Sequence, residues 1–92
     1  MNKSDLIEVI AGKLSGLNAK DVELIVGIVF DSMTEALSKG DRIEIRGFGS
    51  FEVRERKARK ARNPKTGASV DLGARKVPFF KVGKELKEMV ND

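Results

Sequence analysis

The sequence contains no cysteine, no histidine and no long apolar run. Without cysteine there is no disulfide framework, no thiolate metal site and no thiol nucleophile, and a short chain without disulfides favours the cytoplasm. No segment reaches the roughly 18 consecutive apolar residues of a membrane span. The opening MNKSDLIEVI lacks the basic and apolar regions of a signal peptide. We therefore expect a soluble protein of the cytoplasm.

Catalytic groups are equally scarce. Besides the missing histidine and cysteine, the chain has no glycine-rich phosphate loop with a lysine and no pair of carboxylates inside an apolar segment. Nucleophilic, general-base and metal-assisted chemistry therefore lack their usual side chains. We expect no enzymatic activity, no cofactor, no metal and no small-molecule substrate.

Charge is abundant, and it is divided unevenly along the 92 residues. Residues 1–40 hold four cations and six anions, a balance of −2, whereas residues 41–92 hold fourteen cations and eight anions, a balance of +6. A chain of this length rarely supports two cores, so we expect a single domain over 1–92. Its second half is where an anionic partner would bind.

Apolar residues at helical spacing predict a helix over residues 3–15, with Asn2 as its N-cap. A second helix is predicted from Ala19 to Lys39, with Asn18 as the cap. Between Val22 and Phe30 its apolar side chains surround nearly the whole helix, so it must be buried on all sides. One short chain cannot cover it, and we infer a dimer with a shared core.

Extended segments follow the helices. Ile43 and Ile45 alternate with charged residues, which predicts a half-buried strand, and Gly47 permits a tight turn into the next one. Gly49 interrupts the second strand's alternation, which indicates a bulge or a close backbone approach. SVDLGARKVPFF continues the extended pattern.

The chain closes with a short helix, predicted from Lys84 to Met89 or Val90 with Gly83 as its N-cap. The order of two helices, three strands and a last helix is typical of an α+β domain. The phenylalanines are interpreted as a core that joins the second helix to the sheet; they are Phe30, Phe48, Phe51, Phe79 and Phe80.

The run RERKARKARNPKTG, residues 54–67, holds seven cations opposed only by Glu55. It continues from a predicted strand, ends in the turn residues Asn63–Gly67 and returns into an extended segment, which predicts a long β-hairpin arm. The arm has almost no apolar side chains and cannot be packed on a core. It is either a solvated loop or a ribbon that lies against a polyanion. Duplex DNA, RNA and an anionic membrane are the candidate partners.

Two of these candidates lack supporting features. The arm has no apolar face of the kind that interfacial helices insert into membranes. The chain also lacks an aromatic strand motif or a GxxG clamp for RNA. A protein-interaction module without DNA bending stays open as a third class. Lysines at predicted helix starts, Lys3, Lys81 and Lys84, would suit phosphate groups, although exposed lysines tolerated there would look the same.

Residues 47–67, GFGSFEVRERKARKARNPKTG, resemble the signature of the bacterial HU and integration host factor family of DNA-bending proteins. The likeness extends from Asn2-Lys3 to Gly83-Lys84, and RIEIRGFGSF looks most like the beta subunit of integration host factor. Val82 departs from the family, which usually has proline there.

The resemblance implies an intertwined dimer with a helical base, a three-stranded antiparallel sheet and two β-ribbon arms that embrace double-stranded DNA through the minor groove. The expected parts are a dimerisation region over 1–40, a sheet over 41–83 with the arm at about 54–76, and a C-terminal helix over 84–91. Pro64 at each tip would wedge between base pairs and bend the duplex. The protein would serve the bacterial nucleoid, in recombination, replication or transcription.

The resemblance and the charge pattern together predict a set of DNA-binding residues. They are Lys3, Arg46, Arg54, Arg56, Lys57, Arg59, Lys60, Arg62, Asn63, Pro64, Lys65, Arg75, Lys76, Lys81 and Lys84. The partner chain could be a second copy or a related alpha-type chain. Glu44 and Arg46 resemble residues with which integration host factor fixes its preferred site, but a surface ion pair would explain them equally well.

Overall fold

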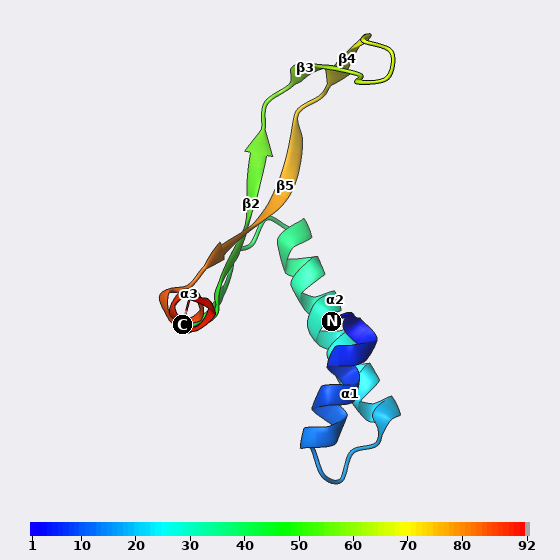
Figure 1. Cartoon of the computed structure of the whole chain (residues 1–92), viewed down its shortest axis with the longest axis vertical. Coiled ribbons are helices and arrows are strands. Elements are labelled where there is room, and N and C mark those ends of the chain that lie inside the picture. The colour runs from blue at the N-terminus through cyan, green and yellow to red at the C-terminus, as the bar shows by residue number, and fades with distance from the viewer. Residues whose placement is uncertain (92) are drawn as a thin grey trace. The chain divides into compact units, whose positions relative to one another are not determined.

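The computed structural model describes residues 1–91, with the side chain of Leu72 excepted. It divides into two compact units, the first from Met1 to Glu35 and the second from residue 36 onward. The first unit holds α1 and most of α2. The second holds the strands and α3 (Figure 1). The prediction of one domain over 1–92 stays a prediction.

α1 (Lys3–Lys13) begins at a capping box on Asn2. The Asp5 amide donates to Asn2 Oδ1 over 2.9 Å, and the Asn2 amide donates to Asp5 Oδ2 over 3.0 Å. These reciprocal bonds satisfy two amides that the helix start leaves unpaired. The helix ends two residues before the predicted Ser15, because Leu14 already takes an extended conformation. Asn2 is therefore confirmed as the N-cap.

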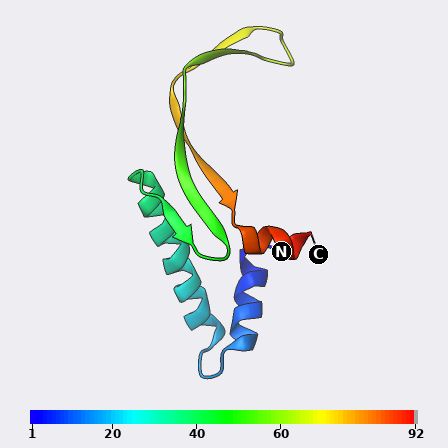
Figure 2. The same cartoon turned by 90° about the vertical axis from the view of Figure 1, so that its left-hand side faces the viewer.

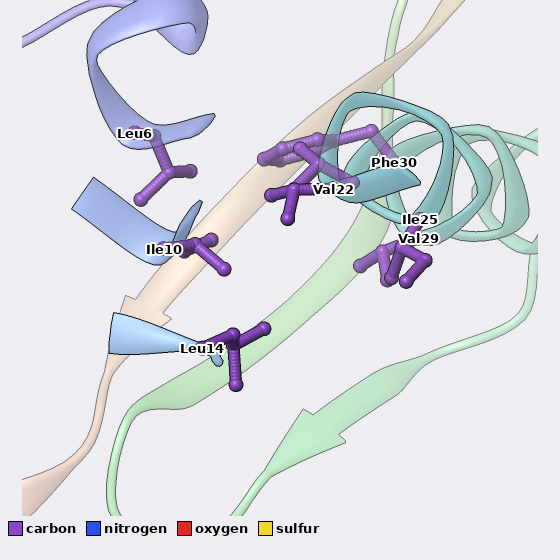
Figure 3. A pocket seen from close by; sticks show the side chains of 8 residues that line it. Leu6, Ile10, Leu14, Val22, Ile25, Val29 and Phe30 are labelled. Carbon is purple, nitrogen blue, oxygen red and sulfur yellow. The ribbon is translucent and has the colours of Figure 1, made fainter. Parts of the chain in front are cut away.

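α2 (Ala19–Ser38) ends one residue before the predicted Lys39. Asn18 caps it as expected, since its Oδ1 accepts the Asp21 amide over 2.9 Å. Only Val22 and Val26 of this helix are buried in the chain taken alone. An apolar pocket of about 210 Å³ lies between α1 and α2 (Figure 3). Its lining comes from both helices: Leu6, Ile10, Leu14, Val22, Ile25, Val26, Val29 and Phe30.

The second unit is built on an antiparallel sheet in the order β1-β2-β5. β1 (Ile43–Ile45) pairs with β2 (Gly49–Arg56), and β2 pairs along its whole length with β5 (Arg75–Val82). The α+β class and the three-stranded antiparallel sheet are thus confirmed. The ring centroid of Phe80 lies 5.5 Å from that of Phe48 and 4.8 Å from that of Phe51, so the three rings pack together. The predicted packing of Phe30 on the sheet stays a prediction.

Within residues 1–91 the structure has five strands, where the sequence pattern predicts three. β3 (Arg59–Arg62) and β4 (Ser69–Leu72) form a separate two-stranded sheet at the far end of the β2–β5 ribbon, as Figure 2 shows. Two short interruptions, at residues 57–58 and 73–74, separate these strands from β2 and β5. The chain therefore makes one long hairpin in two segments, because pairing stops at both interruptions and resumes beyond them.

The turn at residues 46–48, followed by Gly49 at the start of β2, fixes the root of the sheet. The register from β1 through β2 to β5 is continuous at Gly49, so the predicted bulge is absent and the alternative, a close backbone approach, is correct. A side chain on Gly49 would meet the Lys81 carbonyl at 2.5 Å and the Phe80 ring at 2.7 Å. The Gly83 amide donates to the Phe48 carbonyl over 2.9 Å and anchors the start of α3 (Lys84–Val90).

Within residues 1–91, no helix is long and apolar enough to cross a membrane. In the same part of the chain no cluster of acidic side chains is arranged to hold a metal ion.

Candidate nucleic-acid interface

The β2–β5 ribbon presents two chemically different faces. The antiparallel register places Phe51 opposite Phe80 on one face and Glu52 opposite Phe79 on the other. Since strand side chains alternate between faces, Arg54 and Arg56 share the face of Glu52. The guanidinium of Arg54 lies over the Phe79 ring and pairs with Glu52.

Like charges meet where the ribbon approaches its first interruption. Arg56 lies directly opposite Arg75 in the register, on the same face of the sheet. Cations placed opposite one another in a sheet are destabilising unless an anion lies between them. With Lys57, Arg59 and Val77 these two arginines line an open hollow of about 580 Å³. Four of its five lining residues are cations, so the hollow is a cationic site.

The β3–β4 segment carries three of the arm's cations, Arg59, Lys60 and Arg62. Lys60 lies opposite Asp71 and Arg62 opposite Ser69, so both cations share one face. Arg59 projects to the other face, with Ala61 beside it. All three cations are exposed, and Ala61 is half-buried. Both faces of the arm therefore offer positive charge to a groove.

The tip of the arm is organised by hydrogen bonds from its own side chains. Asn63 Oδ1 accepts the Lys65 amide over 2.9 Å, and Thr66 Oγ1 accepts the Ala68 amide over 3.3 Å. Backbone bonds join Asn63 to Gly67 and Ala68 at 2.7 and 2.8 Å. Pro64 is exposed at the turn. The side chain of Asn63 is thus a turn former in this structure, and the ring of Pro64 is free to make contacts.

A second cationic hollow, of about 260 Å³, lies at the root of the sheet. Arg42, Arg46 and Lys81 line it together with Glu44, and Arg42 Nη2 donates to the buried Ser50 Oγ over 3.4 Å. The sequence pattern predicted Arg46 and Lys81 but missed Arg42. Arg42 precedes β1 and alternates with its apolar residues, and the hydrogen bond to Ser50 of β2 places it at this hollow.

Lys3 and Lys84 are each the first residue of a helix, as predicted, and both are exposed. At α1 the carboxylate of Asp5 already accepts one amide of the helix start, so a phosphate there would share the site with an anion. Lys3 belongs to the first unit and the other predicted residues to the second. Within the second unit, the predicted cations other than Lys84 lie on the arm, in the hollow at Arg56 or in the hollow at Arg46. Lys76 lies apart from the hollow, because it pairs opposite Glu55 on the other face of the ribbon.

Comparison with known proteins places the chain in a family. Residues 1–91 match the model of the bacterial DNA-binding protein family. The chain is 56% identical over 92 residues to integration host factor subunit beta of Marinobacter nauticus, covering all of this chain and 94% of that protein. It is 57% identical over 90 residues to DNA-binding protein HU of Geobacillus stearothermophilus, covering 98% of this chain and 99% of that protein.

A solved structure shows the same likeness. The Anabaena HU–DNA cocrystal structure superposes with a TM-score of 0.87 at 41% identity, covering 98% of this chain and 97% of that chain. The sequence identities to a beta subunit of integration host factor and to an HU protein are nearly equal. Identity therefore does not decide which of these two proteins the chain resembles more. The chain belongs to the bacterial DNA-binding protein family, which includes HU and integration host factor.

Proposed function

We propose that the protein is a dimeric architectural protein that binds duplex DNA with two β-ribbon arms and bends it. The observation that carries the proposal is the cationic hairpin, whose cations lie on both faces and whose tip exposes Pro64. The arm has no core to pack on, and its opposed arginines at residues 56 and 75 need an anion between them. A phosphate backbone supplies that charge continuously.

The arms bind in the minor groove. That groove shows a degenerate pattern of donors and acceptors, so a ribbon of arginine and lysine reads charge and groove width there more than sequence. The contacts come from the arm and from the root of the sheet, with Lys3 and Lys84 at the helix starts. The arm residues are Arg56, Lys57, Arg59, Lys60, Arg62, Lys65, Arg75 and Lys76. The root residues are Arg46 and Lys81, joined by Arg42.

Pro64 converts binding into bending. Its ring is apolar and rigid and has no amide hydrogen to satisfy, so it can enter the base stack. Unstacking one step costs a few kcal/mol, which is recovered when the bent duplex touches more of the protein. The hydrogen bond from the Lys65 amide to Asn63 fixes the turn in which the ring is presented.

The dimer is inferred from the apolar surface of the first unit. In the chain alone, Leu24 is 65% exposed and Ile28 56%, although both lie in the middle of α2. The pocket between α1 and α2 is also open and wholly apolar (Figure 3). Contiguous apolar surface of this kind marks an interface. A second copy or a related alpha-type chain would cover it, and the dimer would act in the cytoplasm at the nucleoid.

Binding is tested by measuring duplex affinity against salt. If a dimer covers about ten phosphates, log affinity against log salt has a slope near −9. Arg56→Ala should flatten the slope by about one unit per contact, or about two for a dimer. Lys13→Ala removes an equal charge from the far end of α1 and is the matched control, with an unchanged slope. A flat salt response of the wild type would contradict backbone binding. Tighter binding to duplex RNA of the same sequence would favour the RNA alternative.

A further inference from the structure

We infer that Arg54 positions the arm and does not contact phosphate. This inference rests on the proposed DNA-binding function, and it reassigns one of the cations that the charge pattern alone places on the DNA. Arg54 stands at the root of the arm, inside β2 and ahead of the first interruption at residues 57–58. Its contacts set it apart from the cations farther out.

The guanidinium of Arg54 is engaged on two sides. Its Nε and Nη2 donate to the same carboxylate oxygen, Glu52 Oε1, over 3.1 and 3.0 Å. Its central carbon also lies 3.5 Å from the centroid of the Phe79 ring. The side chain is 48% exposed and that of Glu52 31%. The guanidinium therefore lies over an aromatic ring while two of its nitrogens are held by a carboxylate.

The sheet register explains why these three residues meet. Glu52 is the direct partner of Phe79 across the β2–β5 pair, and Arg54 follows Glu52 on the same face. The diagonal from Arg54 to Phe79 is within reach of a long side chain and an aromatic ring. Arg54 thus links the two strands of the ribbon through side chains, in addition to their backbone bonds.

The link lies just before the arm's own contacts begin. The next residue on this face of β2 is Arg56, which faces Arg75 and lines the cationic hollow. Repulsion between those two arginines opposes pairing at that end of the ribbon. The contacts of Arg54 with Glu52 and Phe79 add attraction between β2 and β5 at the preceding residue on this face. The direction in which the arm leaves the sheet is therefore fixed by residues that need not touch DNA.

Arginine suits this role and lysine does not. A planar guanidinium donates through two nitrogens and stacks on a ring at the same time, whereas an ammonium is a point charge without a flat face. A phosphate contact tolerates either cation more readily, because charge supplies most of the attraction. Arg54→Lys therefore separates the two roles.

The first experiment observes Arg54 itself by NMR in the full-length protein. Side-chain protons held over an aromatic ring are shielded, so the Arg54 Hδ and Hε resonances should lie upfield of those of Arg56. Phe79→Leu, which alters no charge, should abolish the shift. The decisive spectrum is recorded with saturating duplex. Retained shielding is the expected result, and loss of the shielding on DNA would overturn the inference, because Arg54 would then have left the ring.

The second experiment compares salt dependence with bending. Arg54→Lys and Arg54→Ala should both leave the slope of log affinity against log salt within about 0.5 of the wild type. Both should weaken affinity by about three- to tenfold, the scale of an exposed ion pair with a cation–π contact. Arg56→Ala, on the same face, is the matched control and should flatten the slope by about two. Full activity of Arg54→Lys, together with a flattened slope in Arg54→Ala, would show a phosphate contact and overturn the inference.

A double substitution tests whether Phe79 acts through Arg54. Arg54→Ala with Phe79→Leu should weaken binding no more than Arg54→Ala alone, while Arg56→Ala with Phe79→Leu should show the two losses multiplied. Multiplied losses in the first pair would overturn the inference. A wild type that fails to bind duplex would instead overturn the proposed function. The shielding of Arg54 in the free protein does not test DNA binding, so the two failures can be told apart.

Discussion

In the proposed function, Pro64 is the residue through which the arm bends DNA and does more than adhere to it. The arginines and lysines would hold a straight duplex, but a rigid ring without an amide hydrogen is useful only inside the base stack. Pro64→Ala should therefore reduce bending, measured by energy transfer between dyes at the duplex ends, more than it reduces affinity. A nicked duplex, in which unstacking is partly done, should lose less affinity than an intact one on the same change. An unchanged bend on intact duplex would reduce Pro64 to a turn former.

Gly49 supports the site through packing. A side chain there would lie 2.5 Å from the Lys81 carbonyl and 2.7 Å from the Phe80 ring, so β2 and β5 would have to separate. Gly49→Ala should lower the free energy of unfolding by about 1 to 3 kcal/mol, measured by urea denaturation at fixed protein concentration.

Gly12→Ala is the matched control for this substitution. Gly12 lies inside α1, and a side chain there meets nothing within 4 Å, so the change should stabilise the protein by about 0.5 to 1 kcal/mol. Equal effects of the two substitutions would contradict the close approach at Gly49.

The sequence indicates some residue roles and not others. The interrupted alternation at Gly49 predicts a bulge or a close approach, because a glycine inside a strand commonly marks one of the two. The atoms that it approaches, on Phe80 and Lys81, depend on the pairing of β2 with β5. The stacking of Arg54 on Phe79 escapes prediction for the same reason. Arg54 and Phe79 are far apart in the sequence, and nothing in it indicates that they meet until the register of β2 with β5 is known.

At the scale of elements, the helix boundaries follow from local chemistry. Asn2 and Asn18 cap the helices that they precede, since a short amide side chain satisfies an exposed backbone amide. The interruption of the arm at residues 57–58 and 73–74 was not predicted from the sequence. Like-charged residues continue through the first interruption without a proline or glycine to mark it.

The exposed apolar face of α2 leads us to expect that two chains associate through it. Ile28→Asp would place a charge on a surface that is covered in a dimer, at a cost of several kcal/mol, and should yield an unfolded or monomeric chain. Ile28→Val, the control, should cost about 1 kcal/mol and keep the dimer. Sedimentation measures the mass, and the wild-type unfolding midpoint should rise with protein concentration. A folded wild-type monomer with a concentration-independent midpoint would contradict the shared core.

At the scale of the whole molecule, the uneven charge of the two halves corresponds to two different surfaces. The acidic first half carries the apolar face of α2, and the basic second half carries the arm and the two cationic hollows. Composition and periodicity are enough to separate these roles. They do not choose the partner of the proposed dimer, because a related chain with the same apolar pattern would fit as well as a second copy.

The proposed dimer bends the duplex to which it binds. The most direct test is energy transfer between dyes at the two ends of a duplex of about 30 base pairs, a length over which bending is costly without protein. Anisotropy of the same sample reports saturation independently. We expect transfer to rise as the wild-type protein saturates the duplex at low salt, and to fall back as added salt releases it. Saturated binding with unchanged transfer would show that the protein binds the duplex without bending it.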